Sequence, residues 1–204
     1  MTLGKRILDI ALALILGAIL LLPGLFIALA VLLSSGRPIL HRSERMRTTD
    51  EAFQLWKFRS MRPDKSDAGV TGGDKSDRIT AIGRVLRRTR LDELPQLWNV
   101  LRGDISFVGP RPPLRRYTDM FPDLYAQVLH SRPGITGLAT LRFHRHEERL
   151  LADTRSASET EEVYCRRCVP RKASLDLIYQ QNRTLCMDIA LMGETITRLI
   201  PSRR

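Results

Sequence analysis

Residues 91–112 read LDELPQLWNVLRGDISFVGPRP, and this stretch constrains the structure more than any other part of the chain. Two adjacent carboxylates, Asp92 and Glu93, stand just before a run of apolar residues at helical spacing. Because proline is tolerated in the first turn of a helix and not deep inside it, Pro95 predicts a helix that begins near Asp92. The apolar face of this helix would carry Leu94, Leu97, Trp98 and Leu101.

Asp92 would then lie at the N-terminus of the helix, where unpaired backbone N–H groups and the helix dipole favour a carboxylate anion. Such a carboxylate is suited to attack a phosphorus atom or to hold a divalent cation. A plain capping role explains the same residues equally well. Further along, Arg111 stands between Pro110 and Pro112, in a rigid turn that would present its guanidinium to an anion in bidentate geometry.

Together with several other stretches, this one resembles the bacterial sugar transferases, the monotopic polyprenyl-phosphate phosphoglycosyl transferases. The resemblance covers most of the chain, and it depends on the joint occurrence of stretches that are weak signals singly. The other matching stretches, in chain order, are KRILD (5–9), WKFRSM (56–61), GRVLRR (83–88), RPGITGL (132–138), DLIYQQN (176–182) and MDI (187–189).

The resemblance implies the transfer of a sugar 1-phosphate from a UDP-sugar to polyprenyl (undecaprenyl) phosphate, with UMP released, as the first membrane step of a glycoconjugate pathway. It implies that Asp92 is the nucleophile of a phosphosugar–enzyme intermediate and that Glu93 is a metal partner or positioning group. A donor diphosphate calls for Mg²⁺, which takes one or two carboxylates besides phosphate oxygens, so Asp92 and Glu93 are the expected metal ligands.

Phosphoryl transfer also needs positive groups around the phosphate oxygens. Asp176 and Tyr179 belong to a matching stretch, although helix capping and core packing explain them as well. A solvated strand face is the alternative for Lys57 and Arg59. The expected substrate-binding residues are Lys57, Arg59, Arg87, Pro110, Arg111, Pro112, Asp176 and Tyr179.

The composition is strongly basic, with 33 Lys and Arg against 22 Asp and Glu and a net charge of +11 over 204 residues. This excess indicates a polyanionic partner such as anionic membrane lipid, phosphorylated substrate or nucleic acid. Nucleic acid is disfavoured because the chain has no zinc-finger spacing, helix-turn-helix signature or aromatic-studded basic strand. Three cysteines, an odd number, argue against a disulfide scaffold and fit a reducing compartment.

Residues 10–33 carry no charge over 24 positions, which is long enough to reach across a bilayer core. Basic residues on both flanks and the central Pro23–Gly24 favour a re-entrant helix whose two ends lie on the cytoplasmic side. Leu22, where many members of the family have serine, weakens this interpretation; a spanning helix or a secretory signal are the alternatives. We therefore expect a re-entrant membrane helix over 1–36 and a catalytic domain over 37–204 on the cytoplasmic face of the bacterial inner membrane.

The expected fold is mainly α, with a small β-hairpin and amphipathic interfacial helices, in a monotopic membrane protein. The hairpin is predicted over residues 38–62 with its turn at 48–51, and a loop over 63–77. Helices are predicted over 77–90, over 113–130 with a break at Pro122, and over 185–200 with Leu185, Ile189, Met192, Ile196 and Leu199 on one face.

Two further interpretations stay open. His144, His146, Cys165 and Cys168 could form a tetrahedral zinc site, although this spacing is a weak signal. A non-enzymatic, basic, membrane-anchored scaffold and a nucleotide-sugar hydrolase are the alternative functions. The sequence does not identify the sugar, the polyprenol or the pathway. It does not identify the oligomeric state either, and a homodimer stays open.

Overall fold

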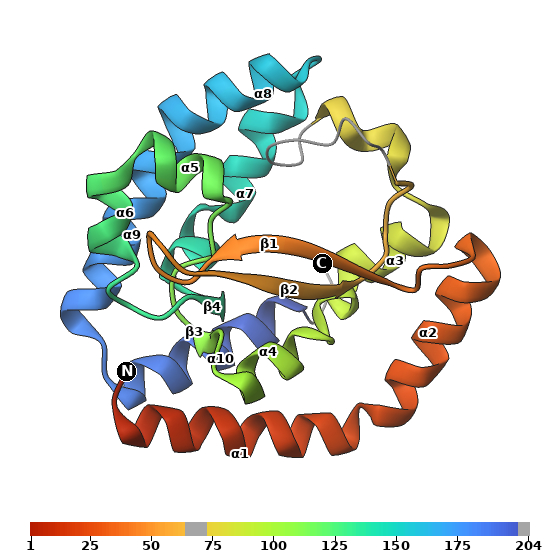
Figure 1. Ribbon diagram of the computed structural model, residues 1–204, viewed down its shortest axis with the longest axis horizontal. Helices are drawn as coiled ribbons and strands as arrows, with labels where there is room; N and C mark the ends of the chain where they lie inside the picture. The colour runs from red at the N-terminus through yellow and green to blue at the C-terminus, as the bar shows by residue number, and fades with distance from the viewer. Residues whose placement is uncertain (64–72, 200–204) are drawn as a thin grey trace.

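The computed structural model describes residues 1–63 and 73–199 (Figure 1). The chain begins with two apolar helices, α1 (Leu3–Ile19) and α2 (Leu21–Ser35), which meet at a bend of 63°. Within the described ranges, no single helix is long and apolar enough to cross a membrane. The bent pair taken together does meet that requirement, by length and composition alone.

The break between these helices falls at Leu20, and not at Pro23–Gly24 as the sequence analysis placed it. Proline lacks an N–H, and its ring clashes with the carbonyl four residues earlier, which here belongs to Ile19. For this reason α1 ends at Ile19, while Pro23 lies in the first turn of α2, where its missing N–H has no helical partner to lose.

The predicted hairpin is confirmed. Strands β1 (Leu40–Met46) and β2 (Ala52–Phe58) pair antiparallel, with Met46 opposite Ala52 at the closed end. In the turn, the Thr48 hydroxyl accepts hydrogen bonds from the backbone N–H groups of Asp50 and Glu51, which is typical of Ser and Thr in turns. Most of the loop predicted over 63–77 lies outside the described residues.

A second pair of strands, β3 (Ser106–Val108) and β4 (Gly134–Thr136), was not predicted. The two strands are parallel, and three residues each are too few to show a period in the sequence. The backbones approach so closely around Gly109 that a Cβ built there would lie 2.1 Å from the Arg132 carbonyl oxygen. Glycine at this position therefore permits the pairing that precedes Arg111.

We expect Gly109→Ala to destabilise the protein by about 3 kcal/mol, because the atoms it meets are backbone atoms that cannot rotate away. The matched control is Gly193→Ala in α10 (Leu185–Leu199), where no atom lies within 4 Å of the added Cβ. That control should be neutral or gain about 1 kcal/mol from helix propensity. Urea unfolding of both variants measures the difference, and equal stability would contradict the close approach.

The stretch around Asp92 differs from the prediction. Leu91–Glu93 form a single 3-10 turn, and α4 (Gln96–Arg102) begins after Pro95, so Asp92 is not the N-cap of this helix. Leu97 and Leu101 do pack against the core, but Trp98 is 54% exposed and is not part of the buried face. Arg90, the residue directly before the 3-10 turn, has φ 60°, and the chain changes direction there.

The helices predicted over 77–90 and 113–130 are present with different bounds. The helix predicted over 77–90 begins later, as α3 (Ala81–Thr89), because the Thr80 hydroxyl accepts a hydrogen bond from Gly83 N–H and caps it there. Pro122 separates two helices as expected. Their bounds, with those of the later helices, are α5 (Arg115–Met120), α6 (Pro122–Val128), α7 (Leu138–Ala152), α8 (Ala157–Val163), a π-helical turn (Tyr164–Cys168) and α9 (Val169–Asn182). Of these, α7, α8 and α9 were not predicted.

The hairpin crosses the middle of the molecule, with α5 to α9 grouped toward one end and α1, α4 and α10 along the lower side (Figure 1). One hydrophobic cluster joins α5, α6 and α9 around Tyr117, and a second joins α1, β2, α4, β3, α7 and α10 around Val100 and Ile105. A third, around Val31, Phe58 and Leu86, packs α2 against the hairpin and α3. The second cluster thus places the N-terminal helix directly against β3.

Candidate active site

The 3-10 turn brings the two adjacent carboxylates of Asp92 and Glu93 into the interior, where each is only 7% exposed. Ionised carboxylates are almost never buried to this degree without partners. Arg90 directly before the turn has the left-handed conformation, which is uncommon outside glycine and is frequent at functional sites. The turn is therefore an unusual local structure, and its contacts explain how it is stabilised.

Glu93 is surrounded by three cations that all approach its Oε1 atom. Lys57 Nζ lies at 2.9 Å, Arg111 Nη2 at 3.3 Å and Arg90 Nη1 at 3.5 Å. Burial alone would raise the pKa of Glu93, but Lys57, Arg111 and Arg90 outweigh it and hold that pKa below its usual range. Glu93 is therefore an anion that holds these three cations in place.

Lys57 reaches this site from β2, where it pairs across the hairpin with His41. Burial lowers the pKa of Lys57 to about 8, although Glu93 opposes the shift. The ammonium is thus a cation at neutral pH whose charge depends on its carboxylate partner. The structure thus brings Lys57, an expected substrate-binding residue, into contact with Glu93.

Arg111 follows β3 in a loop whose two flanking prolines both accept hydrogen bonds from other parts of the chain. Pro110 is fully buried and its carbonyl accepts a hydrogen bond of 2.8 Å from Gly134 N–H. The Pro112 carbonyl accepts one of 3.3 Å from Arg45 Nη1. Burial, and then the nearby Arg111, lower the pKa of Arg45 to about 10, so two guanidiniums are held close together beside Glu93. The sequence analysis missed Arg45 as a site residue.

Asp92 differs from its neighbour because its Oδ1 atom is buried and has no hydrogen-bond partner among the described residues. Burial raises the pKa of Asp92, Lys57 opposes this shift, and the Glu93 charge adds to it. Burial destabilises such an oxygen as an anion, and no side chain in the described part of the chain bonds to it. It is therefore the atom of this pair that is available to attack or to coordinate.

The remaining predicted cations have different partners. Arg87 Nη1 lies 3.1 Å from Met61 Sδ, and its charge favours the ionised form of Asp92. Arg59 instead donates to the carbonyls of Ser35, Gly36 and Arg37, at the C-terminus of α2. The structure therefore places Arg87 at the site and Arg59 at the end of the apolar helix pair.

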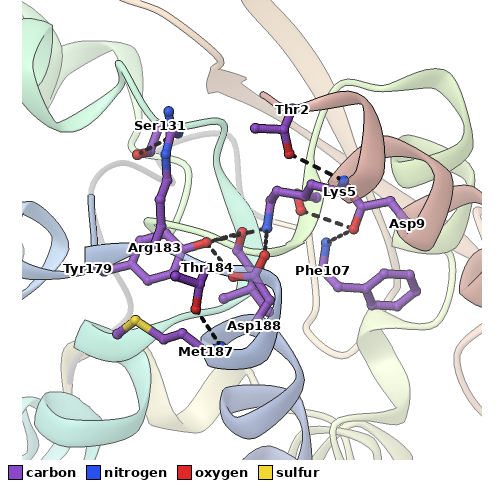
Figure 2. A network of polar contacts seen from close by, with 12 residues as sticks. Thr2, Lys5, Asp9, Phe107, Ser131, Tyr179, Arg183, Thr184, Met187 and Asp188 are labelled. Atoms are coloured by element: carbon purple, nitrogen blue, oxygen red, sulfur yellow. Dashed lines mark hydrogen bonds and ion pairs between the residues drawn. The ribbon is translucent and has the colours of Figure 1, made fainter. Parts of the chain in front are cut away.

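Asp176 and Tyr179 lie on α9, and none of their described hydrogen bonds reaches Asp92 or Glu93. Asp176 is 6% exposed, its Oδ1 has no partner among the described residues, and burial raises its pKa to about 7 against the effect of Lys172. Tyr179 is 1% exposed, and its hydroxyl bonds to Lys5 and Asp188 (Figure 2). The same hydroxyl lies 3.3 Å from the Val108 carbonyl oxygen. Of the two residues predicted from the stretch 176–182, Tyr179 therefore belongs to a separate hydrogen-bond network with Lys5 and Asp188.

The zinc hypothesis gains no support from the described part of the chain, in which no three His, Cys, Asp or Glu side chains come together. Cys165 and Cys168 lie in the π-helical turn, and His144 Nε2 contacts Glu148 Oε1 at 3.2 Å. Asp92 and Glu93 are a pair only, but Mg²⁺ binds through one or two carboxylates when phosphate oxygens complete its coordination. The unpartnered Oδ1 of Asp92 fits that role, whereas Glu93 Oε1 is already shared by three cations.

Comparison with known proteins places the chain in a family. The family model described as bacterial sugar transferase matches residues 1–202. The chain is 38% identical over 205 residues to a UDP-glucose:undecaprenyl-phosphate glucose-1-phosphate transferase of Caulobacter vibrioides, covering 97% of this chain and 70% of that protein. It is 40% identical over 167 residues to the Escherichia coli protein of the same name, covering 79% of this chain and 36% of that longer protein.

A third relative is the exopolysaccharide production protein PSS of Rhizobium leguminosarum bv. phaseoli, which is 38% identical over 181 residues, or 84% of this chain and 82% of that protein. The family match extends over both the apolar helix pair and the buried Asp92–Glu93 turn. This chain therefore belongs to the bacterial sugar transferase family.

Proposed function

We propose that this protein transfers a sugar 1-phosphate from a UDP-sugar to undecaprenyl phosphate, giving undecaprenyl diphosphate-sugar and UMP. The names of the Caulobacter vibrioides and Escherichia coli relatives support this reaction and make UDP-glucose the first donor to test. The observation that carries the proposal is the buried Asp92 oxygen without a partner among the described residues, beside a carboxylate that holds three cations.

The reaction proceeds in two displacements at one phosphorus atom. Asp92 attacks the phosphorus that carries the sugar, and the bond from that phosphorus to the UMP oxygen breaks. A phosphate oxygen of undecaprenyl phosphate then attacks the same phosphorus, and the bond to Asp92 breaks, which restores the carboxylate. Arg111, Lys57 and Arg87 would stabilise the charge on the equatorial oxygens. This role is supported by the contacts of Arg111 and Lys57 with Glu93 beside Asp92.

Mg²⁺ held by Asp92 and by phosphate oxygens would neutralise the donor diphosphate. The chain's own residues do the rest: Glu93 fixes the position of Lys57 and Arg111, and the burial of Asp92 excludes water from the attacking oxygen. Asp176 remains a proposed donor-site residue because its buried Oδ1 has no partner in the described chain.

Radiolabelled UDP-glucose, undecaprenyl phosphate and Mg²⁺ with purified protein test the reaction. Transfer puts label into the organic phase, and that phase should stay empty with an Asp92→Asn variant. A nucleotide-sugar hydrolase would leave the label in the aqueous phase as free sugar phosphate, without need of the lipid. A scaffold would give neither product. Label in the organic phase is thus the result that only the proposed transferase gives.

We expect Arg111→Lys to lose activity by one to two orders of magnitude, roughly the effect of removing one oxyanion donor. Lysine keeps the charge but not the planar fork that binds two oxygens at once. The measurement is kcat/KM for lipid-linked product, with Arg102→Lys, which is on the exposed end of α4 and 58% exposed, as the control. Near-normal turnover in Arg111→Lys would mean that the phosphate contact lies elsewhere.

We also propose that α1 and α2 insert into the inner leaflet and return, with both ends on the cytoplasmic face. Their outer surface carries exposed apolar side chains that water would not favour. The acceptor's polyprenyl chain is itself dissolved in the bilayer, which suits a catalytic domain held on its surface, and the basic excess suits anionic lipid. The exposed residues are Leu3, Ile7, Leu14, Ile15, Ile19, Leu21, Leu22, Leu25, Phe26, Leu29 and Leu33.

This topology predicts that a cysteine at Thr2 is protected from impermeant thiol reagents in intact cells, because a re-entrant pair keeps the N-terminus inside. The native Cys165, Cys168 and Cys186 are replaced first, and permeabilised cells provide the positive control. Labelling of Thr2→Cys from outside an intact inner membrane would establish a spanning helix instead.

A further inference from the structure

A group of four buried polar side chains, outside the Asp92–Glu93 turn, joins the first apolar helix to the end of the chain. We name it the anchor junction. Its members are Lys5 and Asp9 on α1, Tyr179 on α9 and Asp188 on α10. The exposed fraction is 9% for Lys5, 3% for Asp9, 1% for Tyr179 and 3% for Asp188. Three of the four are ionisable groups that water would solvate well.

Three of these side chains point toward one another in Figure 2. Lys5 Nζ lies 2.6 Å from Asp188 Oδ2, and the Tyr179 hydroxyl donates to Asp188 Oδ1 at 2.6 Å. Lys5 Nζ also lies 3.3 Å from the Tyr179 oxygen. Because the pair is buried and each partner is satisfied, it fixes the start of α1 to α9 and α10 in one geometry.

The junction also holds β3. The Phe107 N–H, on the edge of β3 that β4 leaves free, donates to Asp9 Oδ1 at 3.2 Å, and the Ser106 hydroxyl donates to the same oxygen at 3.1 Å. At the other end of the strand, the Tyr179 hydroxyl lies 3.3 Å from the Val108 carbonyl. Asp9 on α1 therefore bonds directly to the backbone of β3, and the Tyr179 hydroxyl lies beside the last residue of that strand.

From Val108 the chain reaches Arg111 through two residues that have no freedom to adjust. Gly109 N–H donates to Thr136 O at 2.9 Å, and Gly134 N–H donates to Pro110 O at 2.8 Å. The Arg111 guanidinium then lies 3.3 Å from Glu93. A shift of Val108 is thus passed along the backbone to Arg111, and a misplacement of about 1 Å at a reacting centre lowers rates by as much as two orders of magnitude.

We propose that Lys5, Tyr179 and Asp188 are positioning residues that set the place of the Arg111 loop and thereby couple the seating of the apolar helix α1 to catalysis. They act through Asp9 and β3 and do not touch substrate. The kinetic part of this inference rests on the proposed transfer reaction, whereas its structural part, the hold on residues 106–111, does not.

Tyr179→Phe is the mildest test, because it removes one hydroxyl and keeps the buried ring. The matched control is Thr154→Val, which removes another buried hydroxyl with hydrogen bonds of 2.8 Å and 2.7 Å to Leu151 O and Thr160 Oγ1, between α7 and α8. Amide hydrogen exchange of the full-length protein should become faster at Gly109 in Tyr179→Phe and stay unchanged there in Thr154→Val. Lys5→Met should repeat the Tyr179→Phe pattern, so the outcome does not depend on one variant.

In the transfer assay, Tyr179→Phe should lower kcat by about tenfold, with little change in KM for the UDP-sugar, while Thr154→Val keeps the wild-type kcat. In an Arg111→Lys background the same substitution should have almost no further effect, because the residue it positions is already lost. Equal losses in both backgrounds, or unchanged exchange at Gly109, would overturn the positioning role. Absence of lipid-linked product from the wild type would contradict the proposed function alone, since the exchange measurement still decides the structural part.

Discussion

Asp92→Asn is expected to reduce sugar-phosphate transfer to background while the protein remains folded. Asparagine is nearly isosteric with aspartate, but its amide cannot attack phosphorus to form an acyl phosphate that the acceptor resolves. The structure gives a reason for expecting little loss of stability. Burial raises the pKa of Asp92, so the ionised side chain destabilises the folded state at neutral pH, and a neutral amide at this position removes that charge.

Thermal unfolding and label in the organic phase, measured on the same preparation, test both parts of this expectation. The unfolding temperature should be unchanged or higher than that of the wild type. Leu91→Met, at the neighbouring position of the same turn, is a control that retains the volume of the side chain. Residual transfer by Asp92→Asn above a tenth of the wild-type rate would remove Asp92 from the nucleophile role.

Glu93→Gln should be as severe for a different reason. It leaves Lys57, Arg90 and Arg111 around a neutral amide in a site where Glu93 was 7% exposed. Removing one partner of a buried ion pair destabilises proteins by about 3 kcal/mol, so we expect a loss of this size together with transfer near background. Urea unfolding measures the first effect, and initial rates of lipid-linked product measure the second.

A second substitution separates stability from chemistry. Lys57→Met combined with Glu93→Gln removes one of the uncompensated cations and should recover part of the stability, because an apolar side chain replaces the buried ammonium. It should recover no activity, since both Lys57 and the group that positions Arg111 are absent. Recovery of activity in the double variant would show that neither Lys57 nor Glu93 takes part in the transfer.

The parts of the fold that the sequence predicted are those determined by local chemistry. The hairpin turn at 48–51 and the break at Pro122 each depend on a few adjacent residues. The helix near Asp92 was misplaced because Arg90 reverses the chain and Leu91–Glu93 form a separate turn, which side-chain spacing does not reveal. The β3–β4 pair depends on residues far apart in the sequence. It also depends on Gly109 and Gly134, whose backbones lie in close contact.

The sequence names candidate site residues but not the contacts that join them. Asp92, Glu93, Lys57 and Arg111 stand in recognisable stretches, yet their shared contact at Glu93 Oε1 exists only in the folded chain. Arg59 and Tyr179 stand in stretches of the same kind and make structural contacts instead. Arg45 has no sequence signal beyond its place in β1, and only its bond to Pro112 O reveals it.

The central claim is that Asp92 carries the sugar phosphate covalently during transfer. The most direct test gives the wild-type protein UDP-glucose and Mg²⁺ without undecaprenyl phosphate, and measures UMP release and the mass of the peptide that contains Asp92. Covalent transfer through Asp92 should give a burst of UMP equal to the amount of active enzyme, and a gain of one sugar phosphate on that peptide. UMP that appears only when undecaprenyl phosphate is also present, with no adduct on Asp92, would contradict it and indicate direct transfer in a ternary complex.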